Sequence, residues 1–236
     1  MEKFSFYEIL SFLLPGFVFI GIIQLYQNYV FGRIPFFNME GNFDENFITT
    51  ILYFISGIMI HNFITFWLLK SEKFNWFRNL IMPSVQKISV QNVFIQKIIP
   101  FLNSEYIKLR KHKEIPVREN EAEYNLFDFV YYYLEVNNKI SAAKYFQNLF
   151  FGFRNIFTIS FLLIPVSVII FAITLFGSYT YEQKEVAAWT IVINLAIFLI
   201  LIPFTRQLRV QLVKKVLWSY YVERIHQNEN KSNNNQ

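Results

Sequence analysis

Cysteine is absent from the 236-residue chain, which excludes disulfides, thiolate catalysis, iron–sulfur clusters and cysteine-ligated zinc. Glycine and proline number only 7 each, which excludes collagen-like and low-complexity sequences. Charged residues make up 17% of the chain, whereas a typical soluble domain has about 25%. Taken with a mean hydropathy of +0.29, this shortage of charge favours an integral membrane protein.

Sequence motifs of catalysis and cofactor binding are missing as well. The three histidines, His61, His112 and His226, have no second histidine or glutamate at a metal-ligand spacing. The seven glycines form neither a phosphate-binding loop nor a dinucleotide-binding fingerprint, and no serine lies in a nucleophile-elbow motif. We therefore expect a protein that is not an enzyme and that binds neither a metal nor a cofactor.

Hydrophobic residues make up 54% of the chain, and they are concentrated in four stretches without Asp, Glu, Lys or Arg. A helix needs about 20 apolar residues to cross a hydrocarbon core about 30 Å thick. All four stretches are long enough. They predict transmembrane helices at about 9–30, 47–69, 156–176 and 186–204.

The predicted fold is all-α, with the first two spans in residues 1–70 and the last two in 155–205. Between them, residues 71–154 carry apolar side chains at helical spacing, which predicts a small helical cytoplasmic bundle. Residues 206–226 predict a cytoplasmic tail helix that packs on this bundle. The Asn-rich residues 227–236 predict a disordered tail.

The distribution of Lys and Arg predicts the orientation in the membrane. Residues 70–155 contain 13 basic residues and residues 205–236 contain 6. The other two connections contain one basic residue each, Arg33 and Lys184. Because basic segments stay on the cytoplasmic side, we expect a multi-pass inner-membrane protein with both termini in the cytoplasm and the lipid bilayer as its first partner.

Three polar residues lie well inside the predicted spans: His61, Asn62 and Asn194. They could line a pore, with His61 as a proton-sensitive group. Alternatively they form hydrogen bonds between helices, such as His61 or Asn62 to Asn194, each worth about 0.6 to 2 kcal/mol. We favour hydrogen bonding, because a proton or ion transporter would normally bury a carboxylate and no Asp or Glu lies inside a predicted span.

Pro15 and Gly16 interrupt the first span about seven residues from its start. They predict a helix kink, which could serve gating or simply be tolerated because neighbouring helices satisfy the freed backbone groups.

The densest basic cluster contains Lys108, Arg110, Lys111 and Lys113. Such a cluster can contact nucleic acid or a nucleotide, with Tyr106 as a stacking partner. The alternative is attraction to anionic lipid headgroups.

Two parts of the sequence resemble a known family. One is FYEIL at 6–10 followed by LLPG at 13–16. The other is YYYLEVNNK at 131–139, continuing to FQNLFF at 146–151 and RN at 154–155. These segments resemble small four-span membrane proteins encoded beside bacterial anti-phage systems, most closely the accessory membrane protein of type VI-B CRISPR loci.

This resemblance implies a non-enzymatic accessory or effector protein of antiviral defence, with no catalytic residues to carry over. Such a protein would act as an oligomer, by modulating a cytosolic RNA-guided nuclease, by responding to a nucleotide signal, or by permeabilising the membrane as a channel. Two other functions stay open: an inert membrane anchor or scaffold for a soluble partner, and a small-solute channel unrelated to defence.

The predicted topology can be tested with a reporter that is active only in the periplasm. Fused to the C-terminus, the reporter is expected to be inactive, because the basic segments hold both termini in the cytoplasm. A fusion in the loop that contains Arg33 is the matched control and should be active. Activity of the C-terminal fusion would contradict the topology.

Overall fold

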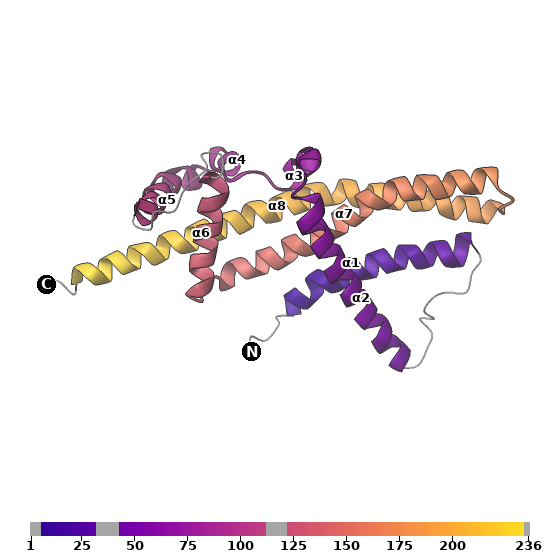
Figure 1. Cartoon of the computed structure of the whole chain (residues 1–236), viewed down its shortest axis with the longest axis horizontal. Helices are drawn as coiled ribbons and strands as arrows, with labels where there is room; N and C mark the ends of the chain where they lie inside the picture. The colour runs from indigo at the N-terminus through magenta and orange to yellow at the C-terminus, as the bar shows by residue number, and fades with distance from the viewer. Residues whose placement is uncertain (1–5, 32–42, 112–121, 234–236) are drawn as a thin grey trace. The chain divides into compact units, whose positions relative to one another are not determined.

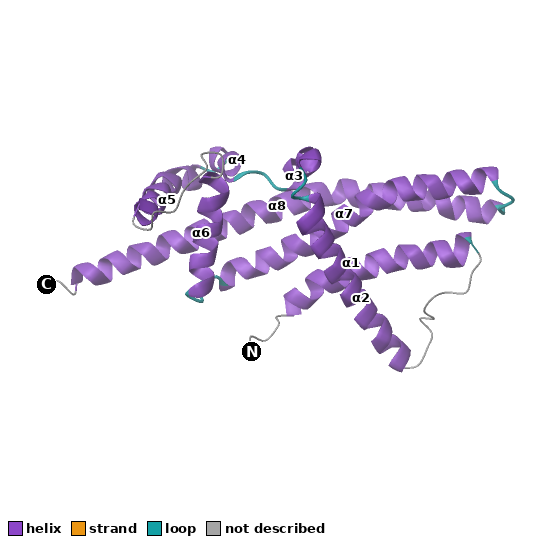
Figure 2. Cartoon of the chain, in the orientation of Figure 1, coloured by secondary structure: helices purple, strands orange, loops and turns teal. Residues whose placement is uncertain are grey.

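The computed structural model describes residues 6–31, 43–111 and 122–233, and within these ranges all regular secondary structure is helical (Figures 1 and 2). The predicted all-α fold is confirmed. Four of the helices are long and apolar enough to cross a membrane, as the sequence predicted, and they indicate a membrane protein.

These four helices are α1, α2, α7 and α8. Helix α1 (Phe6–Leu25) continues into a π-helical turn, η1 (Tyr26–Val30), and α2 (Phe43–Phe63) continues into a second one, η2 (Ile64–Leu68). Helix α7 covers Ser141–Phe176 and α8 covers Tyr181–Asn233. The described helix therefore includes much of the stretch 227–236 that the sequence predicted to be disordered. A long packed helix extends at little cost, because each added residue brings its own hydrogen bond.

The chain divides into two compact units. The first unit consists of residues 1–81 and 148–205, and it also holds the short helices η3 (Glu72–Phe74) and α3 (Asn75–Ile81). Every polar side chain described as buried belongs to this unit: Ser11, Gln24, Thr49, Asn148, Arg154, Asn155, Thr158, Ser160, Ser167, Thr174, Thr190, Asn194 and Thr205. Many large apolar side chains point outward instead. This distribution suits helices that are surrounded by lipid.

Helices α1 and α2 cross at two glycines, where their backbones touch (Figure 1). A Cβ atom added to Gly16 would lie 1.7 Å from the carbonyl oxygen of Tyr53, and one added to Gly57 would lie 1.8 Å from that of Phe12. Small residues at membrane-helix contacts allow such an approach. Gly16, predicted from sequence to form a kink with Pro15, therefore serves the crossing with α2, while Pro15 lies inside α1.

Helices α7 and α8 form a hairpin whose turn is fixed by a capping box. The backbone N–H of Thr180 donates to Gln183 Oε1 at 2.8 Å, and the N–H of Gln183 donates to Thr180 Oγ1 at 3.3 Å. Further along the hairpin, the rings of Phe157 and Phe198 stack with centroids 4.8 Å apart. The side chain of Gln183 also donates to the carbonyl of Val30 at 2.9 Å, which ties the end of η1 to α8.

The second unit consists of residues 82–147 and 206–236. It contains α4 (Val85–Val90), α5 (Val93–Lys111), α6 (Ala122–Val136) and the C-terminal part of α8. The Asn92 side chain caps α5 by accepting the N–H of Phe94 at 3.1 Å. Helix α5 continues past Pro100 to Lys111. Helix α6 ends at the Asn137–Asn138 pair, where Asn138 adopts a φ of 55°.

The tail part of α8 supplies much of the core of the second unit. Its buried residues are Leu212, Val213, Val216, Leu217 and Tyr220, and they share the core with Ile95, Ile98 and Leu102 of α5 and Val130 and Leu134 of α6. On the surface of the unit, Phe94 packs edge-to-face against Trp218 with ring centroids 4.3 Å apart. Within this unit the C-terminal part of α8 packs on the other helices, as the sequence predicted for the tail helix and the bundle.

The glycine crossing gives a stability prediction. Gly16→Leu and Gly57→Leu are each expected to destabilise the protein by at least about 2 kcal/mol, because a side chain would overlap the backbone of the facing helix. Gly21→Leu is the matched control in α1, since nothing lies within 4 Å of a Cβ at Gly21. Thermal unfolding in one detergent would compare the three variants. Equal melting temperatures would contradict the crossing.

Candidate functional site

A buried arginine is the most unusual side chain of the first unit. Arg154 on α7 is only 2% exposed, although burying a charge away from water is costly unless hydrogen bonds compensate. Its Nη2 donates to Thr65 Oγ1 at 3.0 Å and to Asn155 Oδ1 at 3.2 Å. The guanidinium also lies 4.9 Å from the ring centroid of Phe151. Arg154 is thus held by polar groups from α7 and η2 and by an aromatic face.

His61 on α2 completes this group. Its Nδ1 lies 3.2 Å from Arg154 Nη2 and 3.2 Å from Asn155 Nδ2. Both of these nitrogens can only donate, so His61 Nδ1 must accept and the ring proton must sit on Nε2. A neutral imidazole therefore faces the guanidinium. We call His61, Thr65, Arg154 and Asn155 the arginine site.

Helix α1 covers the arginine site from a third side. The ring of Phe12 meets the His61 ring edge-on at a centroid distance of 5.2 Å, and Phe151 of α7 does the same at 5.2 Å. The carbonyl of Phe12 is also the group against which Gly57 packs, one helical turn before His61. The glycine crossing therefore sets the position of the imidazole relative to α1 and α7.

A second polar group joins α1, α7 and α8. Ser167 Oγ accepts the hydroxyl of Tyr26 at 2.6 Å and Asn194 Nδ2 at 3.0 Å, and it donates to the carbonyl of Leu163 at 2.7 Å. Asn194 is fully buried. We call Tyr26, Ser167 and Asn194 the serine site. Its Tyr26 lies in the π turn η1, and Thr65 of the arginine site lies in the π turn η2. Such turns often occur at functional positions in helices.

The polar residues that were predicted inside the spans do not pair with one another as the sequence suggested. His61 bonds with Arg154 and Asn155, whereas Asn194 bonds with Ser167. Asn62 is exposed and belongs to neither site. The partner of α2 in these bonds is α7, which His61 faces. Successive residues of a helix point in different directions, so Asn62 is turned outward.

Sequence reasoning missed five residues of the two sites: Tyr26, Thr65, Arg154, Asn155 and Ser167. Arg154 and Asn155 stood at the edge of the third span, where a charge is expected to face water. A usable signal was present in α7, since Ser160, Ser167 and Thr174 recur every seven residues and all three are buried. Small polar residues at that spacing are typical of one face of a membrane helix packed against another.

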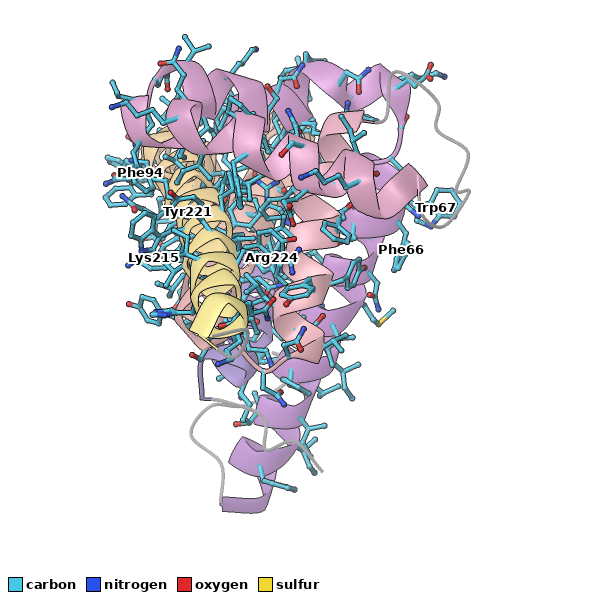
Figure 3. All side chains as sticks on the ribbon, turned by 90° about the vertical axis from the view of Figure 1, so that its left-hand side faces the viewer. Phe66, Trp67, Phe94, Lys215, Tyr221 and Arg224 are labelled. Carbon is cyan, nitrogen blue, oxygen red and sulfur yellow. The ribbon has the colours of Figure 1, made fainter. Side chains whose placement is uncertain are left out.

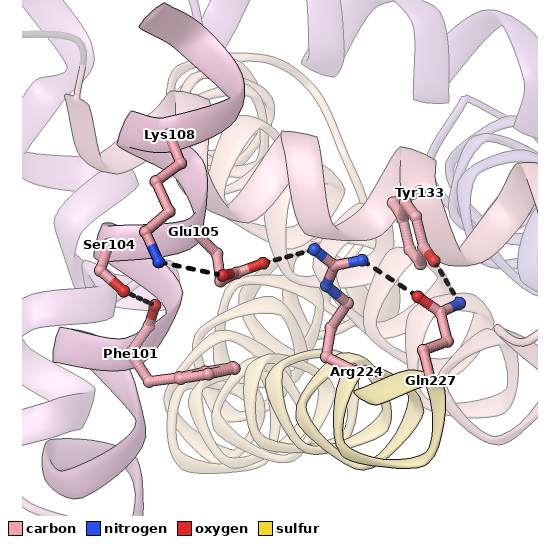
Figure 4. A network of polar contacts seen from close by, with 7 residues as sticks. All are labelled: Phe101, Ser104, Glu105, Lys108, Tyr133, Arg224 and Gln227. Carbon is pink, nitrogen blue, oxygen red and sulfur yellow. Dashed lines mark hydrogen bonds and ion pairs between the residues drawn. The ribbon is translucent and has the colours of Figure 1, made fainter. Parts of the chain in front are cut away.

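A polar network holds the second unit together (Figure 4). Arg224 of α8 forms an ion pair with Glu105 of α5, and its Nη1 donates to Gln227 Oε1 at 3.0 Å. Gln227 Nε2 in turn donates to the hydroxyl of Tyr133 on α6 at 2.8 Å. Three helices are thereby linked through one arginine. A further ion pair joins Lys139 Nζ to Glu223 at 3.6 Å.

The predicted basic cluster lies at the end of α5. The Lys108 side chain is 76% exposed and its Nζ is 3.8 Å from Glu105. Arg110 and Lys111 belong to the last turn of the helix, and their side chains lie outside the described residues, as does the whole of Lys113. At Lys108, the cluster presents its charge to solvent.

The arginine site is able to position helices through its hydrogen bonds. Among the residues that the structure describes, no group of three or more His, Cys, Asp or Glu could hold a metal ion. The arginine site instead places one fixed positive charge against a neutral imidazole and two polar side chains, all in an apolar surrounding. It joins α2 to α7, as the serine site joins α1 and α8 to α7.

Removing the buried charge should destabilise the protein. Arg154→Gln is expected to cost about 2 to 3 kcal/mol, because it shortens the donor and breaks charged hydrogen bonds to Thr65 and to Asn155. Arg206→Gln, an exposed arginine on α8, is the control and should change little. Both variants can be compared by thermal unfolding in detergent. If the two melting temperatures agree, the arginine site does not hold α2 to α7.

Comparison with known proteins adds no relative, since neither a protein-family model, nor a curated protein, nor a solved structure matches this chain.

Proposed function

We propose that the chain is an integral inner-membrane accessory protein of a bacterial anti-phage defence system of the CRISPR type, without enzymatic activity of its own. In this proposal the four apolar helices anchor it in the bilayer with both termini in the cytoplasm. The second unit then binds and modulates a cytosolic partner, such as an RNA-guided nuclease. The resemblance at 6–16 and 131–155 supports the defence role.

The polarity of the first unit supports a membrane anchor with a fixed internal structure. Its buried polar side chains bond to one another from helix to helix at the arginine and serine sites. Groups engaged in this way hold helices together. They are not arranged as a row of free groups along a path for ions, which favours modulation of a partner over conduction by a single copy.

The exposed charge of the second unit is the observation that carries the proposed partner binding. Its acids Glu105 and Glu223 are engaged in ion pairs with Arg224 and Lys139. The Lys108 side chain, whose Nζ lies 3.8 Å from Glu105, is 76% exposed at the end of α5. Charge complementarity of this kind directs association and selects partners, so an acidic protein surface, a nucleotide or RNA would be attracted here.

A second candidate function, membrane permeabilisation by an oligomer, is favoured by a separate observation. Several buried polar atoms of the described first unit have no hydrogen-bond partner, among them Gln24 Nε2, Ser160 Oγ and Asn194 Oδ1. Unpaired polar atoms in an apolar interior are costly. A rearrangement between copies that admitted water would satisfy them, and it would open a polar path.

Phage challenge of cells that carry the gene with its genomic neighbours tests these functions. The combined replacement of Lys108, Arg110, Lys111 and Lys113 by Gln is expected to abolish protection, because it removes the charge that attracts the partner. The double variant His61→Leu with Asn194→Leu should keep protection when compared at equal membrane expression. Plating efficiency is the readout, together with a dye for membrane potential.

The two candidates differ in the outcome. Modulation of a partner leaves the membrane potential intact when the system is activated. Collapse of the potential, with full protection by the basic-cluster variant and lost protection by the span variant, would show permeabilisation instead. Full protection by both variants would contradict both functions.

A further inference from the structure

A groove with a volume of about 380 Å³ opens on the surface of the first unit between α1, α2 and α7. Of its nine lining residues, eight are apolar and one, Ser56, is a serine. Ile64 and Ile159 lie deep in it and are 0% and 3% exposed, whereas Met59 on the rim is 68% exposed. The groove is therefore open toward the outside of the unit and lined by hydrocarbon.

The groove follows from the glycine crossing. Two helices whose backbones touch at Gly16 and Gly57 must diverge on either side of that point (Figure 1). The groove lies beside the crossing, where α1 contributes Phe19 and α7 contributes Ile159, Leu162 and Leu163. The lining residues from α2 are Ser56, Met59, Ile60 and Phe63. The space is thus a consequence of the fold of the first unit.

The size and the lining decide between possible occupants. A volume of 380 Å³ is in the range of small-molecule sites, about 300 to 1,000 Å³, whereas a helix with side chains is about 10 to 12 Å across. Helices that pack in membranes also need small residues at the contact, and here the rim is formed by Met59, Phe63 and Leu162. A flexible hydrocarbon chain fits such a groove better than a helix of a second copy.

A cation lies beyond one end of the groove. Past Phe63, η2 contains Phe66 and ends at Leu68, and Lys70 follows in the next turn. Lys70 Nζ lies 4.9 Å from the ring centroid of Phe66. Phe66 and Trp67 are 58% and 73% exposed and project outward from the end of α2 (Figure 3). Exposed aromatic side chains beside a lysine at the end of a membrane helix mark the level of the lipid headgroups.

We propose that this groove binds one acyl chain of an anionic phospholipid, whose phosphate is held at Lys70. The acyl chain supplies van der Waals contacts that the lining residues would lack if the groove were empty. Ile60 and Ile64 of the lining flank His61 in sequence, so the bound chain packs on the same turns that hold the arginine site. This lipid site depends on the membrane location of the first unit and not on a role in defence.

Native mass spectrometry of the full chain in detergent, mixed with phosphatidylglycerol or phosphatidylcholine, tests the proposal. One phosphatidylglycerol molecule should stay bound and be preferred over phosphatidylcholine. Ser56→Phe fills the groove and is expected to lower lipid binding by at least about ten-fold, the equivalent of about two methylene groups. Ile55→Phe, at an exposed position that is not part of the lining, is the control and should bind normally.

The headgroup contact has its own pair of variants. Lys70→Gln should lower the binding of phosphatidylglycerol about five-fold and leave that of phosphatidylcholine unchanged, because one cation near an anionic headgroup is lost. Lys184→Gln, at the start of α8, should change neither. Equal retention of the two lipids by the unaltered chain would overturn the proposal. So would normal binding by a Ser56→Phe variant whose circular dichroism matches that of the unaltered chain.

A second copy in the groove is tested separately. The chain contains no cysteine, so Met59→Cys introduces a single thiol at the rim. With a lipid in the groove, mild oxidation should leave this variant monomeric. Efficient disulfide-linked dimers would show that another copy covers the groove, and they would overturn the lipid assignment.

Discussion

A polar side chain between membrane helices has no water to bond, so each one needs a partner on another helix or on its own backbone, and this constraint organises the first unit. Helix α7 supplies the partners at both sites. Arg154 and Asn155 bond to α2 and η2, and Ser167 bonds to α1 and α8. Each of the other three is therefore tied to α7 by hydrogen bonds, and α1 and α2 also hold each other at the glycine crossing. The polar residues of α7 recur along one face.

The glycine crossing and the lipid groove are two results of the same close approach. Because Gly16 and Gly57 bring two backbones together, the aromatic side chains around them must pack at the sides, and Phe12 is thereby placed against His61. The same divergence of α1 and α2 opens the space that we assign to an acyl chain. A lipid in that space would support the crossing from the outside, as the arginine site supports it from the inside.

The second unit has an apolar core, and among its described residues no charged side chain is buried. Tyr220, Leu134 and Leu102 belong to its interior. The ion pair of Arg224 with Glu105 links α5 to α8. Charged side chains thus join helices within the unit, and at the end of α5 the charged side chain of Lys108 is exposed to solvent.

The sequence by itself determined the all-α class and the four apolar helices, because these depend on local composition: long stretches without charge and apolar residues at helical spacing. It also singled out His61 and Asn194 as polar groups within spans. Only the tertiary structure decided their partners, because pairing depends on the rotation and crossing of helices that lie far apart in sequence. For the same reason Arg154, placed by its charge at the edge of a span, proved to be buried, since Thr65, Asn155 and His61 converge on it from two helices.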